Sequence, residues 1–371
     1  MYSESDIEAA VADGALTPEA AAALRASVSR LRATPAADEE SFRLVTGFND
    51  IFVTIAAILL LVAVWWIGRS IGAALLPAPE WTPGEWTDAS FAALRRSSGA
   101  GNAIAGLLTA AASWGLAEYF TRARRMALPS IVLLLSFAIG VSAIVAGSLT
   151  ALTGGAGERT LATIAAASGI ATAAAAYAHW RRFHVPITIA ALTAALVVTT
   201  LALLVAAVPA ASRIILWLML AAGLAVFAFA MWWDVSDRER TTRRSDVAFW
   251  LHLGAAPLIA HPVFWLLGLL EGDVGAGRAL IVILLYLGFG AVALAVDRRA
   301  ILVSSLVYVL YALSALFRSA GAVGLSLALT GLMIGSALLL LSAFWQPIRR
   351  RVVTRLPAEW QARLPVAHRR R

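Results

Sequence analysis

Residues 51–76 read IFVTIAAILLLVAVWWIGRSIGAALL, an apolar run long enough to cross a lipid bilayer as one helix. A hydrocarbon core of ~30 Å needs about 20 apolar residues in helical conformation. Nine further stretches of similar character follow, so we expect an all-α, polytopic transmembrane bundle of about ten spans. The expected spans lie near 51–76, 103–120, 127–151, 161–178, 186–208, 213–233, 247–270, 279–296, 301–317 and 322–345.

The composition is that of a membrane protein. Hydrophobic residues make up 60% of the 371 positions and charged residues only 14%, and the mean hydropathy is +0.80. A water-soluble chain of this size needs far more charge to cover its surface. The absence of cysteine excludes disulfides, thiolate metal sites and cysteine nucleophiles.

The arginines predict the orientation, because cytoplasmic joints retain basic residues. Clusters occur at alternate joints, whereas the other joints carry mostly single arginines. With an even number of spans, this pattern predicts a bacterial inner-membrane protein with both termini in the cytoplasm. The clusters are Arg122, Arg124 and Arg125; Arg181 and Arg182; Arg238, Arg240, Arg243 and Arg244; Arg298 and Arg299; and Arg349–Arg351.

The even-numbered spans resemble one another, which suggests tandem helical hairpins of one design. Small-residue turns, such as Gly99–Gly101 and Gly155–Gly157, are expected to open them. The alternative is that bilayer thickness and the retention of arginine inside produce the same periodicity without a true repeat.

Three domains are expected: an acidic helical cap at 1–48, the bundle at 49–346 and a basic tail at 347–371. In the cap, Gly14 should end one helix and Thr17 should cap the next. The cap is expected to dock on its own chain, on a protein partner or in a homo-oligomer, and its net acidity argues against nucleic acid. The arginine-rich tail is expected to contact anionic lipid headgroups.

The segments Asp6–Ala20, Ser41–Phe52 and Phe249–His252 resemble those of uncharacterised prokaryotic multi-span membrane proteins with a short helical cytoplasmic N-terminus. That group is known only as a domain of unknown function. The resemblance implies a polytopic inner-membrane protein, and it implies no activity and no site residues.

The loop after the first span is rich in proline and tryptophan up to about Thr87. Residues 88–96 are then expected to form a short amphipathic helix lying in the membrane interface. Near the end of the second span, Glu118 precedes Arg122 by four residues, which puts both on one helix face. This spacing predicts a local ion pair, with a proton or cation site as the alternative.

The seventh span holds the most unusual pattern, with His252, Pro257, His261 and Pro262. Proline removes a helical hydrogen bond, so the prolines predict an interrupted or kinked helix of the kind that transporters use at mid-membrane sites. Nine residues separate the histidines, which puts them on opposite faces and argues against a shared metal. The two alternatives are a packing helix with hydrogen-bonded histidines and a substrate or proton site.

The ninth span carries Ser304, Tyr308 and Tyr311 along one expected face. Each hydroxyl needs a partner at that depth, so the face should meet another helix or line a polar cavity. In the tenth span, Gly331 and Gly335 have the spacing that allows close helix packing, within one chain or between copies.

No catalytic, metal or cofactor motif is present, so an enzyme is not expected. The proline-containing span and the mid-depth tyrosines favour a small-solute transporter or permease whose path is lined by the residues of the seventh and ninth spans and by Glu118. The alternative is a non-catalytic membrane scaffold or regulator that acts through the cytoplasmic cap.

Overall fold

The protein is represented by a computed structural model that describes residues 7, 10–24, 48–80, 87–238, 240, 242–269, 276–319 and 325–365. It is 87% helical, and the described residues contain no strand. The all-α prediction is therefore confirmed. The chain forms two compact units, Met1–Leu44 and Val45–Arg371.

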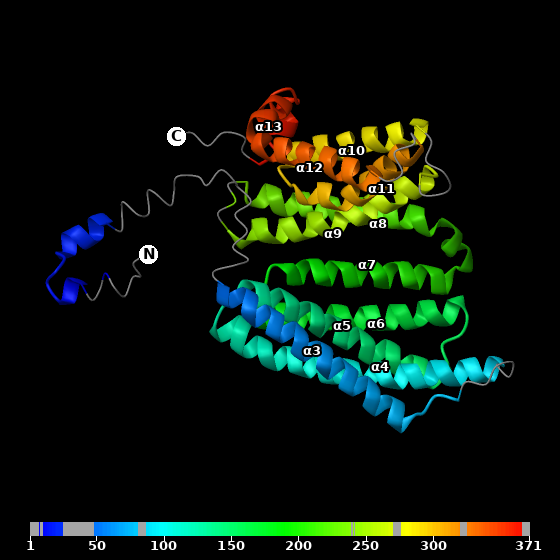
Figure 1. Cartoon of the computed structure of the whole chain (residues 1–371). Helices are drawn as coiled ribbons and strands as arrows, with labels where there is room; N and C mark the ends of the chain where they lie inside the picture. The colour runs from blue at the N-terminus through cyan, green and yellow to red at the C-terminus, as the bar shows by residue number, and fades with distance from the viewer. Residues whose placement is uncertain are drawn as a thin grey trace. The chain divides into compact units, whose positions relative to one another are not determined.

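The second unit contains the bundle, and its helices alternate in direction as they lie side by side (Figure 1). In chain order they are α3 (Phe48–Leu75), α4 (Asp88–Ala117), the π-helical turn η1 (Glu118–Ala123), α5 (Ala127–Thr153), α6 (Glu158–Phe183), α7 (Ile187–Ala207), the 3-10 turn η2 (Pro209–Ile214), α8 (Ile215–Ser236), α9 (Arg243–Leu266), α10 (Ala276–Val296), α11 (Ala300–Ser319), α12 (Ser326–Ala343), α13 (Trp345–Val353) and α14 (Ala358–Gln361).

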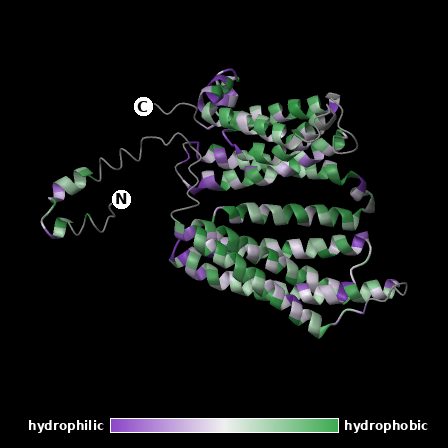
Figure 2. Ribbon diagram, viewed as in Figure 1, coloured by the Kyte–Doolittle hydropathy of each residue, from purple (hydrophilic) through white to green (hydrophobic). Residues whose placement is uncertain are grey.

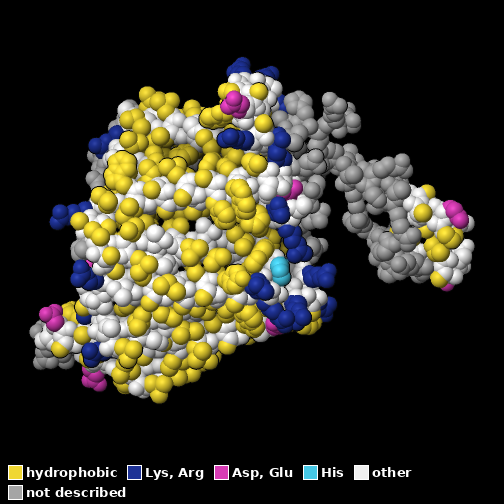
Figure 3. Space-filling view, turned by 180° about the vertical axis from the view of Figure 1, so that it is seen from behind, with side chains coloured by type: hydrophobic (Ala, Val, Ile, Leu, Met, Phe, Trp, Pro, Cys, Tyr) yellow, Lys and Arg dark blue, Asp and Glu magenta, His cyan; other side chains and the backbone are white. Residues whose placement is uncertain are grey.

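The bundle is built from helical hairpins. Packing joins α4 to α5, α6 to α7, α8 to α9 and α10 to α11, while α9 also contacts α7 and α11. We call the end of the bundle that carries the joints 118–126, 184–186, 237–242 and 297–299 the arginine end. Arginine side chains gather along this edge (Figure 3), whereas the helix surfaces between the two ends are largely apolar (Figure 2).

Seven helices of the described chain are long and apolar enough to cross a membrane: α3, α5, α6, α7, α8 with part of η2, α9 and α10. Helices α12 and α13 qualify only as a pair bent by 70°, which makes eight if the pair counts as one span. Each of the ten expected stretches overlaps a helix, but α4 is not among the seven, and the described residues of α11 count as a shorter apolar helix, Ala300–Ser314. A multi-pass membrane protein is supported, and ten spans remain a prediction.

Helix α4 corrects two expectations from the sequence. It runs without a break from Asp88 to Ala117, so residues 88–96 are its first turns and not a separate interfacial helix. The small residues Gly99 and Gly101 lie inside the helix and do not form a turn. The reason is that Thr87 caps the helix, with its Oγ1 accepting from the Ser90 amide, and the glycines are used for packing.

The glycines allow the backbones of α3, α4 and α5 to touch. A methyl group added at Gly147 of α5 would lie 2.6 Å from the Gly99 carbonyl oxygen of α4, and one added at Gly72 of α3 would lie 2.4 Å from the Gly101 Cα. Small-residue contacts of this kind hold membrane helices together, because lipid tails give no hydrophobic advantage to larger side chains.

Each arginine-end joint contains one non-glycine residue with a left-handed backbone. These residues are Arg125, His184, Arg240 and Asp297, with φ between 52° and 59°, and no other described non-glycine residue has positive φ. The conformation turns the chain at the end of a helix, as at His184, whose amide donates to the Trp180 carbonyl at 3.0 Å. A left-handed residue therefore recurs in the four joints, although the hydrogen bonds around it differ from joint to joint.

Helix α9 is continuous through Pro257 and Pro262, from Arg243 to Leu266. The expectation of an interrupted helix is therefore wrong. Helices in membranes tolerate proline where neighbouring helices support the segment, and α9 packs against α7, α8 and α11.

The C-terminal part bends at the arginine end. Helix α12 ends at Ala343, and α13 leaves it at 70° and carries the arginine cluster Arg349–Arg351.

In the first unit, Gly14 adopts φ 71° after a helical turn, and the Thr17 hydroxyl accepts from the Ala20 amide at 3.2 Å. Both helix boundaries expected there are confirmed. Residues 41–47, which belong to one of the resemblance segments, lie outside the described residues.

Candidate functional site

A buried carboxylate on α8 forms the centre of the first polar cluster. Asp234 is two residues from the end of α8 and is 1% exposed. Its Oδ2 receives the Nε2–H of His252, from α9, at 2.9 Å, and Arg298 donates to both carboxylate oxygens. Arg298 also donates to the Ser245 carbonyl at 3.0 Å. We call Asp234, His252 and Arg298 the buried triad.

The triad fixes the protonation pattern of His252. An ionised carboxylate only accepts hydrogen bonds, so the proton shared with Asp234 is on Nε2. The other ring nitrogen, Nδ1, is buried and has no partner in the described structure. It lies next to an ion pair, inside a side chain that is 0% exposed.

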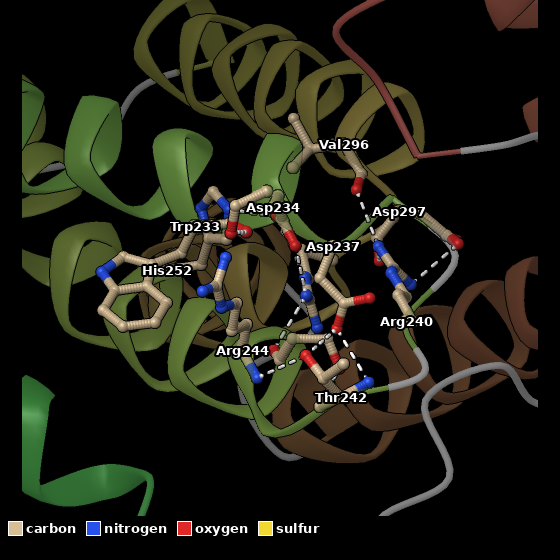
Figure 4. Close-up of polar contacts among 12 residues, drawn as sticks. Trp233, Asp234, Asp237, Arg240, Thr242, Arg244, His252, Val296 and Asp297 are labelled. Atoms are coloured by element: carbon tan, nitrogen blue, oxygen red, sulfur yellow. Dashed lines mark hydrogen bonds and ion pairs between the residues drawn. The ribbon is translucent and has the colours of Figure 1, made fainter.

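A second buried carboxylate, Asp297, joins three parts of the chain at the arginine end. Arg240 donates to its Oδ2 at 3.0 Å, and the Trp345 indole donates to its Oδ1 at 2.7 Å. Arg349 forms an ion pair with Oδ1 at 3.4 Å. Figure 4 shows Arg240 pointing at Asp297 and at the carbonyl of Val296. The Asp297 carboxylate therefore links α13 to the α8–α9 joint and to the α10–α11 joint.

The joint between α8 and α9 is closed by its own hydrogen bonds. Asp237 Oδ2 accepts from the Thr242 amide at 3.0 Å and from its hydroxyl at 2.7 Å, as Figure 4 shows. Arg238 donates to the Leu364 carbonyl at 3.0 Å and thereby holds the described end of the chain against this joint.

A second pair consists of His261 and Tyr308, which the structure brings together from α9 and α11. The Tyr308 hydroxyl lies 2.9 Å from His261 Nδ1. The Tyr308 ring stacks on Phe264, with centroids 4.3 Å apart. His261 lies nine residues from His252, or ~13 Å along the helix. The two histidines thus face different helices, α8 and α11, as their spacing predicted.

No contact joins Tyr311 to this pair among the described residues. Tyr311 lies three residues after Tyr308 on α11 and is 42% exposed. Ser304 lies in α11, and its side chain is outside the described part of the chain. Pro257 is exposed and Pro262 is buried within α9.

Glu118 belongs to a separate ion pair at the arginine end. Its Oε1 accepts from Arg182 Nε of α6 at 2.7 Å, and Arg122 lies 3.3 Å from its Oε2. The pair with Arg122 was predicted, whereas the stronger link to Arg182 joins η1 to α6 and was not.

Gly331 and Gly335 of α12 meet nothing within 4 Å of a side-chain position. In the single chain, therefore, no described atom packs closely at these two glycines.

Two sites escaped the sequence reasoning. Asp234 was missed because it follows Trp232 and Trp233 at the limit of a span and reads as an interfacial residue. His179 of α6 is 1% exposed and lies among Trp114, Phe137 and Phe183. The only sequence signal for either was an ionisable residue at the end of an apolar run.

Among the described residues, no group of three or more His, Asp or Glu side chains lies close enough to hold a metal ion. No protein-family model matches the chain, and no curated protein or solved structure matches it. The resemblance at the N-terminus therefore stays a prediction.

Proposed function

We propose that this protein is a small-solute permease of a bacterial inner membrane, with ten spans and both termini in the cytoplasm, and that it works by transport rather than by catalysis. The observation that supports this proposal is the placement of two histidines on helix α9. It bears one histidine in the buried triad and another in the His261–Tyr308 pair, at two depths and on two faces. Ionisable groups inside membrane spans are costly and are typical of ion and substrate pathways.

The buried triad suggests how the binding of a proton would open the transport path. A proton bound at the free Nδ1 of His252 makes the ring an imidazolium while its Nε2–H stays on Asp234. The positive ring then competes with Arg298 for one carboxylate. Because Arg298 begins the turn into α11, weakening its bond to α8 would loosen α11 and the Tyr308 that it carries.

In this conformation, His261 and Tyr308 bond to each other, so the proposed path is closed at their depth. Transport requires that bond to open. Single cysteines test this directly, because the natural chain contains none. We would place them at Leu258, His261, Tyr308 and Tyr311, with exposed Leu287 of α10 as the lipid-facing control.

A membrane-impermeant thiol reagent is then applied to intact cells and to inverted vesicles. Labelling of Leu258, His261 or Tyr308 from either side, with Leu287 silent, is the expected result. Silence at all three from both sides, with a cysteine at the loop residue Ala156 labelled normally, would contradict a permease.

The proton step has its own measurement. Labelling at Leu258, normalised to labelling at Ala156, should rise as the pH falls and His252 gains its second proton. Asp234→Asn should abolish this pH dependence, because the carboxylate no longer pulls on either cation. If the normalised labelling rate of the otherwise natural sequence does not depend on pH, the proton-driven mechanism is contradicted. The proposal that the protein is a permease is not affected by that result.

The topology is tested by the same reagent. Cysteines at the arginine-end residues Arg244 and Arg351 should label only in inverted vesicles, and a cysteine at Ala156 should label only in intact cells. The clustering of arginines at one end supports this assignment.

The alternative is a non-catalytic scaffold or regulator acting through its cytoplasmic cap. One observation favours it: the described C-terminal segment is held by Arg238 and Arg349, which bond the carbonyls of Leu364 and Pro365. Such a protein would keep a dry interior and would lose a co-purifying partner when residues 1–40 are deleted. Silent cysteines together with such a partner would favour this second function.

A further inference from the structure

The bend between α12 and α13 helps to form a pocket that the transport proposal does not use. Its volume is 170 Å³, and it lies between α10, α11, α12 and α13. The wall is almost entirely apolar, with Leu302, Val303, Leu306, Leu338 and Leu341. Val303, at 59% exposed, forms an open rim.

The charge of the pocket is confined to the arginine end. Arg299 lines it there, with its guanidinium 5.0 Å from the centre of the Trp345 ring, which also lines the pocket. A cation held over an aromatic ring keeps a fixed position at the polar boundary. Helix α13 starts at this point and adds the exposed Arg350 and Arg351 to the same end.

The apolar wall is long enough to hold part of a lipid chain. Leu306 lies seven residues beyond Arg299 on α11, and Leu338 lies seven residues before Trp345, so each is ~10 Å from the charged end. A positive group at the membrane surface, followed by about 10 Å of apolar wall open at the side, is complementary to a phosphate followed by an alkyl chain.

We propose that this pocket binds an anionic phospholipid from the leaflet at the arginine end, with its phosphate on Arg299 and part of one acyl chain against the apolar wall. The bound lipid would bridge α11 to the α12–α13 bend. The site differs from general attraction of lipids to the basic tail, because it specifies one arginine and one apolar wall. It is also independent of whether the protein transports a solute.

The test is native mass spectrometry of the delipidated full-length protein in detergent, titrated with phosphatidylglycerol or with phosphatidylcholine of the same acyl chains. Phosphatidylglycerol should bind more tightly. Arg299→Gln should weaken phosphatidylglycerol binding about fivefold, as expected for one arginine at a membrane surface. It should weaken phosphatidylcholine less, because the choline cation offsets the charge of the phosphate that Arg299 contacts. Val303→Trp, which fills the pocket from its exposed rim, should weaken both lipids.

The matched control is Arg244→Gln, an exposed arginine at the same end but outside the pocket. It should change neither affinity. Equal binding of the two lipids, or an equal loss in Arg244→Gln and Arg299→Gln, would overturn the proposal, the latter because it indicates only general charge attraction. Thermal unfolding of each variant separates loss of the site from loss of the fold.

Discussion

Buried charge is the dominant feature at the scale of the residue. Asp234 is almost fully buried and is compensated by Arg298 and His252, so neither charge is left alone in a medium of low dielectric constant. Asp234→Asn should therefore destabilise the protein by about 3–5 kcal/mol, because Arg298 stays buried without its counter-ion. Thermal or denaturant unfolding in detergent measures the change.

The control for this prediction removes both charges. Asp234→Leu combined with Arg298→Met removes both ions of this pair, and such replacements are often neutral or stabilising. The double variant should therefore be clearly more stable than Asp234→Asn. If the double variant is no more stable than Asp234→Asn, side-chain packing rather than charge determines stability at this position.

Two tyrosines of neighbouring helices provide a matched pair. The Tyr308 hydroxyl bonds His261 at 2.9 Å, whereas the hydroxyl of Tyr286 is buried without a partner in the described structure. Tyr308→Phe should lower the free energy of unfolding by about 1 kcal/mol, and Tyr286→Phe should leave it unchanged or raise it. Equal losses in the two variants would mean that the His261 bond contributes nothing.

At the scale of the element, close packing of α4 and α5 depends on having no side chain. Gly147→Ala would put a methyl carbon 2.6 Å from the backbone of Ala103 and of Gly99, so the helices must separate, at about 1–3 kcal/mol. Gly254 of α9 has nothing within 4 Å, so Gly254→Ala should stabilise the protein by roughly 0.5–1 kcal/mol through helix propensity.

The two alanine variants are compared by unfolding in the same detergent. Opposite signs are expected. A stabilised Gly147→Ala would show that α4 and α5 are not in backbone contact.

The sequence predicts helix positions well, because apolar length alone determines them in a membrane protein. It does not determine continuity. Helix α4 continues through residues 88–96 because glycines pack inside it, and α9 continues through Pro257 because its neighbours support it. Breaker residues signal an end of a helix only where no other helix compensates.

The candidate site was predictable only in part for a related reason. His261 and Tyr308 stand out because both lie deep in apolar runs, where any polar group needs a partner. Asp234 and Asp297 lie beside arginines at the ends of runs, where sequence alone cannot distinguish an exposed charge from a buried one. Contacts between joints far apart in the chain, such as the bond from Arg298 to Asp234, decide that difference.

At the scale of the whole molecule, the joints of four hairpins share a left-handed residue. The left-handed residues Arg125, His184, Arg240 and Asp297 occupy the joints between α4 and α5, α6 and α7, α8 and α9, and α10 and α11. Retention of arginine at one face explains the charges of these joints but not their common backbone. The common left-handed residue is what tandem hairpins would share, while the hydrogen bonds around it differ between the joints, and a true repeat stays a prediction.

His184 and Asp297 share the left-handed backbone, but their side chains have different roles, so replacing each by glycine should have opposite effects. His184→Gly should raise the free energy of unfolding by about 1 kcal/mol, because glycine adopts the left-handed conformation without the steric penalty of a side chain. Asp297→Gly relieves the same backbone but removes the carboxylate that receives Arg240 and Trp345, so it should destabilise strongly. Unfolding in detergent compares the two. If both variants are destabilised alike, the four turns do not share a backbone constraint, and the similarity of the hairpins reduces to their arginines.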